Sequence, residues 1–379
     1  MNKIILIGNG FDISHGLRVQ YSDFVNYVLN TLCNNPLTDN PFFKIEITCE
    51  HVSEELKDIV DFSKSPIENL TEIERLSESR SIGEPKKFDL ESKNGLFIKA
   101  FRNGEITWAG FEQSYYDELV FIHKSFLNQN KDFNIKEVEA GKILELNSLF
   151  KDIKDEFIKY LKEEIEPKIS RNDLQASVYF EDCFEKLAID RKADEDEEVF
   201  RKLMGDKPKA ENVLFLCFNY TQVLEKVYNI SNESSEDLSQ KVINIHGELS
   251  NLASIIFGYG DEMDNDFNKM ENYQNSILEH FKSFQYARND NYHRLEAFVE
   301  SGPFQVDIIG HSCGTCDRVM LNYIFQNDFC NRIRIHYYEN NKGENNFIDT
   351  YMNLSRHFSP DQKHKMRSKI LSFKKIYKI

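Results

Sequence analysis

Four short segments place glycine or polar residues directly after apolar runs of the kind that buried strands show. They are Gly8-Asn9-Gly10-Phe11-Asp12, Phe218-Asn219-Tyr220-Thr221, Ile245-His246-Gly247, and Gly310-His311-Ser312-Cys313-Gly314 with Asp317. In open α/β sheets, ligands bind at the carboxyl ends of the strands. The four segments therefore predict one candidate site at that edge of a sheet.

The first segment contains two glycines after the apolar run at 4–7. Glycines at such a turn let backbone N–H groups approach a phosphate, and the N-terminus of the next helix adds a favourable dipole. Gly16 comes later than the third glycine of the usual dinucleotide-binding pattern. A plain tight turn is therefore the alternative to nucleotide binding.

Asn219 and His246 each end an apolar run. The Asn219 carboxamide could cap the next helix, or it could hold a ribose hydroxyl or a water molecule. His246 could act as an acid or base in a cleft, or it could be a hydrogen-bonded core residue. Both readings stay open for each residue on the local pattern alone.

The fourth segment also matches G-x-S-x-G, the turn that carries the nucleophile of α/β-hydrolases. Ser312 would then be the nucleophile. The candidates for its acid and its histidine are Asp328, Asp349, His357 and His364. This alternative is the weaker one, because it leaves no role for the first three segments.

Apolar runs predict buried strands at 4–7, 213–218, 242–245, 254–257, 306–309 and 332–338. Helical spacing of apolar residues predicts helices over 21–29, 108–161, 220–228, 271–284 and 317–329, and residues 34–105 are expected to form helices interrupted by loops. Buried strands that alternate with helices favour a parallel α/β sheet.

We therefore predict a discontinuous, Rossmann-like nucleotide-binding domain over residues 1–30 and 211–345, with strand 4–7 in its centre. A mostly helical insertion over 31–210 and a C-terminal helical segment over 346–379 complete the predicted organisation.

Composition limits the classes of partner. The 379 residues include 47 Lys and Arg against 63 Asp and Glu, a formal net charge of -16, so a broad nucleic-acid-binding surface is not expected. With 30 Phe and 17 Tyr, the chain is not of a disordered type. No apolar run is long enough for a membrane span or a signal peptide, which favours the cytoplasm.

Seven cysteines are scattered along the chain, and only Cys313 and Cys316 form a C-x-x-C pair. A structural zinc site usually needs a second such pair or histidines at ligand spacing. We expect buried, reduced thiols without zinc and without a disulfide.

The segments together resemble the bacterial abortive-infection AbiH family over nearly the whole chain. The resemblance is carried by I-G-N-G-F-D at 7–12 with His15-Gly16-Leu17 and Tyr21-Ser22-Asp23-Phe24, by 108–112, and by the three later segments. That family is similar in turn to the sirtuin-like superfamily of NAD-binding proteins. The chain lacks the four-cysteine zinc module of sirtuin deacetylases, so deacetylation is not expected.

The resemblance implies an anti-phage protein that depletes NAD as a glycohydrolase, without a metal. It implies Asn219 and His246 as catalytic residues. The NAD-binding residues that it implies are Gly8, Asn9, Gly10, Phe11, Asp12, Tyr220, Gly247, Gly310, His311, Ser312 and Asp317. Nicotinamide leaves as a neutral group, so the reaction needs a positioned water more than a strong acid.

A sensor that binds NAD, ADP-ribose or another nucleotide without consuming it is the alternative. Such a sensor would act on a partner through the helical insertion. The expected partners are NAD or a related nucleotide, a phage-derived trigger or partner protein, and a second copy of the chain.

Overall fold

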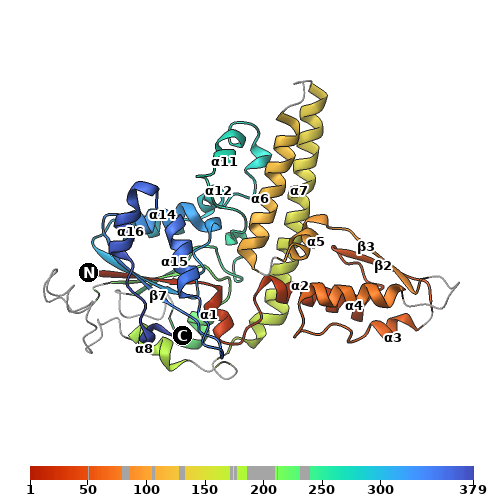
Figure 1. Cartoon of the computed structure of the whole chain (residues 1–379), viewed down its shortest axis with the longest axis horizontal. Coiled ribbons are helices and arrows are strands. Elements are labelled where there is room, and N and C mark those ends of the chain that lie inside the picture. The colour runs from red at the N-terminus through yellow and green to blue at the C-terminus, as the bar shows by residue number, and fades with distance from the viewer. Residues whose placement is uncertain are drawn as a thin grey trace. The chain divides into compact units, whose positions relative to one another are not determined.

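The computed structural model describes residues 1–49, 51–78, 86–104, 107–127, 133–170, 174, 177–185, 210, 212–230 and 240–379. They fold into two units (Figure 1). Unit 1 comprises Met1–Leu17, Lys162–Asp264 and Phe281–Ile379, and unit 2 comprises Arg18–Leu161 and Asn265–His280. The unit boundaries differ from the predicted domain limits at residues 30 and 345, and the predicted limit at residue 211 lies outside the described residues.

Unit 1 contains a five-stranded sheet of β1 (Asn2–Ile7), β4 (Val213–Cys217), β5 (Gln240–Asn244), β6 (Phe304–Ile309) and β7 (Cys330–His336). The strand order is β5-β4-β1-β6-β7, and every neighbouring pair is parallel. This confirms the predicted parallel α/β sheet with the first strand in its centre. The order matches five strands of a Rossmann-like sheet, and it reverses between β1 and β6.

The strands of this sheet are buried because helices cover it. β1, β4 and β6 are buried along their whole length, as expected for a parallel sheet. Ile4, Leu216 and Ile308 share an apolar core with residues of α13 (Asn291–Val299), α14 (Arg318–Gln326), α15 (Phe347–Arg356) and α16 (Lys363–Lys369).

A second apolar region of unit 1 is built around Phe11 of α1 (Asn9–Ser14). Its ring contacts Phe180 of α8 (Val178–Glu185) and Tyr228 of α10 (Val223–Tyr228). Phe184 of α8 contacts Phe215 of β4, which connects this aromatic cluster to the sheet.

Two of the predicted elements are wrong. Residues 254–257 are not a strand: Leu252–Ser254 is a short 3-10 turn, the Ile256 N–H donates to the His246 carbonyl, and Gln285 bonds the Phe257 backbone. A short buried apolar run cannot by itself be distinguished from such a buried loop. The predicted helix over 271–284 is reduced to two short helices, Asn275–Ile277 and Lys282–Gln285 (α12).

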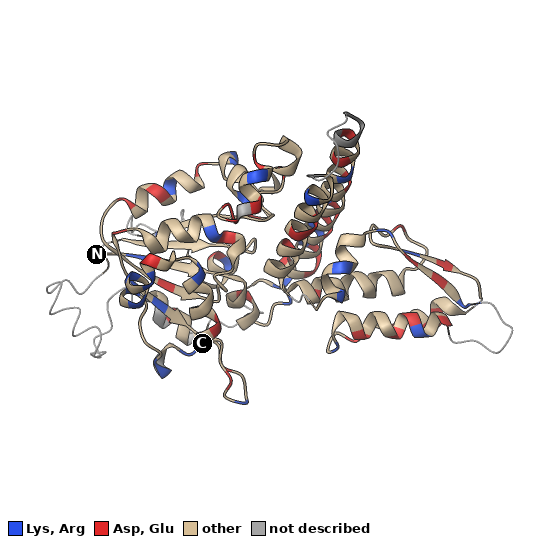
Figure 2. Cartoon of the chain, turned by 45° about the horizontal axis from the view of Figure 1, so that its top comes forward, with Lys and Arg blue, Asp and Glu red and all other residues tan. Residues whose placement is uncertain are grey.

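Unit 2 is mostly helical. Its helices are α2 (Tyr21–Asn34), α3 (Val52–Leu56), α4 (Pro66–Glu78), α5 (Gly95–Arg102), α6 (Trp108–Leu127), α7 (Phe133–Tyr160) and α11 (Asn265–Met270). The antiparallel pair β2 (Phe43–Ile47) and β3 (Phe88–Ser92) lies where only helices and loops are predicted. Acidic and basic residues are interspersed along the long helices (Figure 2).

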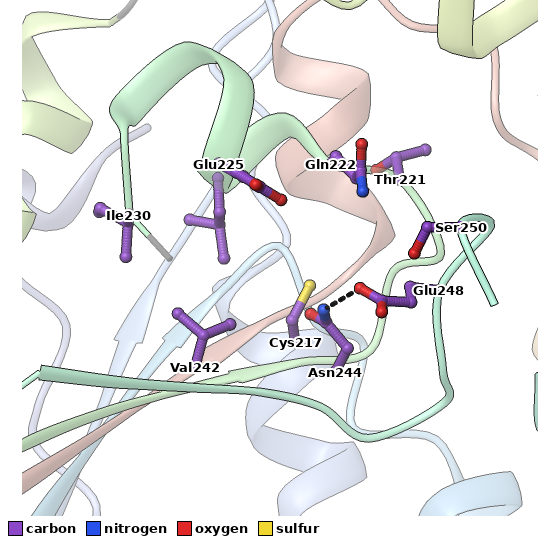
Figure 3. Close-up of a pocket in the computed structure, with 10 residues that line it drawn as sticks. Cys217, Thr221, Gln222, Glu225, Ile230, Val242, Asn244, Glu248 and Ser250 are labelled. Atoms are coloured by element: carbon purple, nitrogen blue, oxygen red, sulfur yellow. Dashed lines mark hydrogen bonds between the residues drawn. The ribbon is translucent and has the colours of Figure 1, made fainter. Parts of the chain in front are cut away.

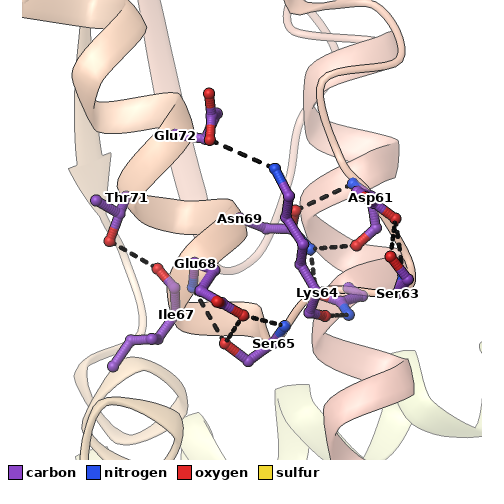
Figure 4. Close-up of polar contacts among 10 residues, drawn as sticks. Asp61, Ser63, Lys64, Ser65, Ile67, Glu68, Asn69, Thr71 and Glu72 are labelled. Carbon is purple, nitrogen blue, oxygen red and sulfur yellow. Dashed lines mark hydrogen bonds and ion pairs between the residues drawn. The ribbon is translucent and has the colours of Figure 1, made fainter.

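Polar side chains define the start of α4 in unit 2 (Figure 4). Glu68 accepts hydrogen bonds from the backbone N–H and the hydroxyl of Ser65, at 2.8 and 2.7 Å, which satisfies donors ahead of the first turn. Asn69 donates to Asn26 of α2 at 2.9 Å. In the part of the chain that the structure describes, no helix combines the length and apolar character needed to cross a bilayer.

Candidate functional site

The four predicted segments follow β1, β4, β5 and β6 and therefore meet at one edge of the sheet. At the point where the strand order reverses, the turns after β1 and β6 pack backbone against backbone. The Gly8 and Gly10 N–H groups donate to the Ile309 and Gly310 carbonyls at 3.0 and 2.8 Å. A Cβ atom on Gly8 would lie 2.4 Å from the His311 Cα atom. Glycine is thus required there by close packing, and both N–H groups have carbonyl partners within the chain.

Asp12 is the centre of the first polar network at this edge. The Asn219 amide donates to its carboxyl at 2.7 Å and to the Gly8 carbonyl at 3.1 Å, and the Thr221 hydroxyl donates to the other carboxyl oxygen at 2.5 Å. All three side chains are buried. Burial raises the pKa of Asp12 to about 7, although the hydrogen bonds from Thr221 and Asn219 oppose the shift. Asp12 can therefore exchange a proton near neutral pH.

This raised pKa predicts a pH-dependent stability. Folded Asp12 holds its proton up to about pH 7, whereas the unfolded residue loses it near 3.8, so stability falls as the pH rises between these values. In Asp12→Asn this dependence is absent. Urea unfolding should show the stability of the variant relative to wild type increasing by about 2–3 kcal/mol from pH 5 to pH 8. A difference independent of pH would contradict the assignment.

Asp317 is the centre of a second network, which includes Lys282, His246 and His311. Its carboxylate lies 2.9 Å from the Lys282 Nζ atom, 3.1 Å from His246 Nε2 and 3.7 Å from His311 Nε2. All four side chains are buried. Burial alone would raise the pKa of Asp317, but the Lys282 charge and then His246 hold it well below the usual range. Asp317 is thus a buried carboxylate with a cationic partner.

The two histidines of the Asp317 network are neutral bases at pH 7. Burial, followed by the Lys282 charge, lowers the pKa of His246. Burial lowers the pKa of His311 to about 4, and its Nδ1 accepts the Cys313 N–H at 3.0 Å. His246 Nε2 makes no well-aligned hydrogen bond in this structure, despite its short distance to Asp317.

The predicted catalytic pair is thus divided between two networks: Asn219 bonds Asp12, and His246 lies beside Asp317. The Phe218 ring contacts both His246 and His311, with centroids 5.2 and 4.1 Å apart. Both histidines belong to the Asp317 network, and Phe218 directly precedes Asn219 of the Asp12 network, so this residue connects the two networks.

The other residues predicted to bind NAD lie in different environments: an aromatic cluster, backbone hydrogen bonds and the exposed surface. Phe11 belongs to the aromatic cluster with Phe180 and Tyr228, while Asn9 is the first residue of α1. The Tyr220 hydroxyl donates to the Ile256 carbonyl at 2.8 Å, and the Gly247 N–H donates to the Asn244 carbonyl. Ser312 is exposed, and its carbonyl accepts from Asn353.

The structure gives the hydrolase alternative no support, because Ser312 does not have the strained backbone of a nucleophile turn. A nucleophile elbow strains the serine, but here the left-handed backbone belongs to Gly310 and Cys313, with φ values of 67° and 52°, and not to Ser312. His357 instead bonds the Cys313 carbonyl at 2.9 Å and Asn322 at 3.0 Å. Asp328 forms an exposed ion pair with Lys365.

Cys313 and Cys316 are free, buried thiols. Burial raises the pKa of Cys313, and the Cys316 sulfur lies 3.6 Å from the Asp317 carboxylate. Within the described ranges, no group of three or more His, Cys, Asp or Glu side chains is arranged to hold a metal ion.

A cavity of about 310 Å³ lies at the carboxyl ends of β4 and β5 (Figure 3). Its lining residues are Cys217, Thr221, Gln222, Leu224, Glu225, Ile230, Val242, Asn244, Glu248 and Ser250. Thr221 both lines the cavity and donates to Asp12, so the cavity borders the first network. Of the ten, Thr221 lies in one of the four predicted segments, and none is a residue predicted to catalyse or to bind NAD. In the sequence, only the polar residues at the start of α10 and Asn244 at the end of β5 could have indicated this cavity.

Comparison with known proteins supports a family assignment. A search of curated proteins finds no match to the chain. A family model described as bacteriophage abortive infection AbiH matches residues 4–339. The match runs from Ile4 of β1 to beyond the end of β7 and includes the four segments at the carboxyl edge of the sheet. The chain therefore belongs to the AbiH family of bacteriophage abortive-infection proteins.

Proposed function

We propose that this AbiH protein hydrolyses the N-glycosyl bond of NAD at the carboxyl edge of its sheet and so depletes NAD during infection. The observation that carries the proposal is Asp12, a buried carboxyl with a pKa of about 7, which is bonded to Asn219 and joined by Thr221 to a cavity. Buried groups with pKa values near the working pH, beside a cavity, are typical of acid–base sites.

In the proposed reaction, water adds to C1′ of the ribose as the bond between C1′ and the pyridinium nitrogen breaks. The nitrogen takes the electron pair of that bond, so nicotinamide leaves neutral and needs no acid. The proton of the attacking water passes to a base. Three bases lie at this edge: Asp12, half-ionised near pH 7, and the neutral His246 and His311. We assign the step to Asp12 or His246.

Asn219 has the positioning role in this proposal. Its amide nitrogen fixes the Asp12 carboxyl and the Gly8 carbonyl, so its replacement would disturb the alignment of water, ribose and base. The second candidate function is nucleotide binding without turnover. The same contacts favour it, because the Asn219 amide is already hydrogen-bonded to the Asp12 carboxyl and is thus engaged within the chain.

A panel of variants tests the proposal. Asn219→Ala and His246→Ala should each lower kcat for NAD loss by about 10²-fold or more, the range for a lost positioning or acid–base group. Ser312→Ala, which alters an exposed residue, should change kcat less than about threefold and is the matched control. Circular dichroism and urea unfolding of each variant separate catalytic loss from unfolding.

The two candidate functions give different outcomes in this panel. Binding of NAD without any loss, in wild type and variants alike, would support the sensor and contradict the hydrolase. A kcat that is insensitive to Asn219→Ala and His246→Ala would show that turnover takes place elsewhere.

A further inference from the structure

The charged residues that line the cavity beside Asp12 indicate which part of a nucleotide could bind in it. Glu225, from the first turn of α10, and Glu248, from the turn after β5, contribute two carboxylates from different walls (Figure 3). Carboxamides, hydroxyls and a thiol supply the other polar groups. Among the ten described lining residues, none is Lys or Arg.

This lining is unsuited to a phosphate. Proteins bind phosphate with Arg and Lys side chains or with backbone N–H groups, whereas carboxylates repel it. The Asn244 side chain donates to Glu248 at 3.1 Å, which orients that carboxylate without neutralising its charge. Carboxylates and amides together accept hydrogen bonds from ribose hydroxyls and attract a cationic ring.

The size of the cavity restricts the ligand further. At about 310 Å³ it is at the lower end of the range of ligand cavities, so it suits one nucleoside better than a whole dinucleotide. Leu224, Ile230 and Val242 supply an apolar part that a flat ring can contact. Thr221 places this space next to the Asp12 carboxyl.

We infer that the cavity binds the positively charged nicotinamide riboside half of NAD⁺, with the phosphates outside it. The inference rests on the proposed function for the identity of the substrate. The inference adds a selectivity between the oxidised and the reduced nucleoside, because only the oxidised form has the positive charge of the pyridinium ring. Glu225 and Glu248 therefore favour the oxidised nucleoside over its uncharged, reduced counterpart.

Binding of three small ligands to the full chain tests the inference by calorimetry. Nicotinamide riboside should bind at least about tenfold more tightly than dihydronicotinamide riboside, which has nearly the same shape and no ring charge. Adenosine monophosphate should not displace it. Equal binding of the oxidised and reduced nucleosides, or displacement by the monophosphate, would overturn the inference.

Variants of the two carboxylates provide the second arm. Glu225→Gln and Glu248→Gln keep the shape of the side chain, and each should weaken nicotinamide riboside binding by about tenfold and reduce the preference for the oxidised form. Glu296→Gln, on the exposed part of α13, removes the same charge at a distance and should leave binding unchanged. Equal binding by all three variants would overturn the inference.

These binding experiments can fail independently of the test for NAD hydrolysis. Charge-selective binding without NAD loss would support the cavity assignment and overturn the hydrolase. NAD loss with a KM unaffected by Glu225→Gln and Glu248→Gln would support the hydrolase and overturn the cavity assignment.

Discussion

Asp317→Asn is expected to lower the free energy of unfolding by about 3–5 kcal/mol at pH 7, the range for breaking a buried ion pair by removing one partner. The substitution keeps the shape of the side chain but leaves the Lys282 ammonium buried without its carboxylate, which lies 2.9 Å away in the wild type. Chemical denaturation of both proteins measures the difference.

A double variant is the control for this expectation. Lys282→Met combined with Asp317→Asn removes both charges, and it should recover most of the lost stability, because the larger cost comes from the orphaned charge. The pH dependence gives a second check. Since the pKa of folded Asp317 lies well below 3.8, its contribution is present above pH 3.8 and is lost as the pH falls through the folded value. A loss below about 1 kcal/mol at pH 7 would contradict this role of Asp317.

Gly310→Ala is expected to destabilise unit 1 by about 3 kcal/mol or more. Gly310 has a φ of 67°, which costs a non-glycine residue roughly 1–2 kcal/mol, and a Cβ there would lie 2.2 Å from the Phe11 backbone nitrogen. Separating the turns after β1 and β6 adds an overpacking cost of about 1–3 kcal/mol.

Gly141→Ala is the matched control for this substitution. Gly141 lies in α7 with open space around its Cβ position, so alanine should be neutral or stabilise by about 0.5–1 kcal/mol. Equal unfolding free energies for Gly310→Ala and wild type would show that the two turns are not packed as described.

The centre of the sheet could be predicted because two of its strands contain continuous apolar runs, which are typical of strands buried on both faces. Ile4–Ile7 and Val213–Cys217 show this pattern, and both are strands. The same rule fails at 254–257, where the backbone bonds a loop carbonyl and the Gln285 side chain. The β2–β3 pair could not be predicted from apolar runs, because both strands are short and half-exposed.

The sequence predicts where the candidate residues lie in the fold, but not which of them contact one another. Parallel strands bring their carboxyl ends together, so the sequence is enough to expect Asn219, His246 and Asp317 at one edge. That Asn219 bonds Asp12 whereas His246 lies beside Asp317 depends on side-chain packing across strands. Lys282 precedes Asp317 by 35 residues, and no local pattern marks it as the partner of that carboxylate.

The most direct test of the account is the fate of NAD⁺ incubated with the purified, full-length protein, alone and with lysate from phage-infected cells. We expect the wild type to form nicotinamide and ADP-ribose in equal amounts, at a rate about 10²-fold or more above that of Asn219→Ala. Intact NAD⁺ after both incubations, despite measurable binding of the nucleotide, would contradict hydrolysis as the activity of this site.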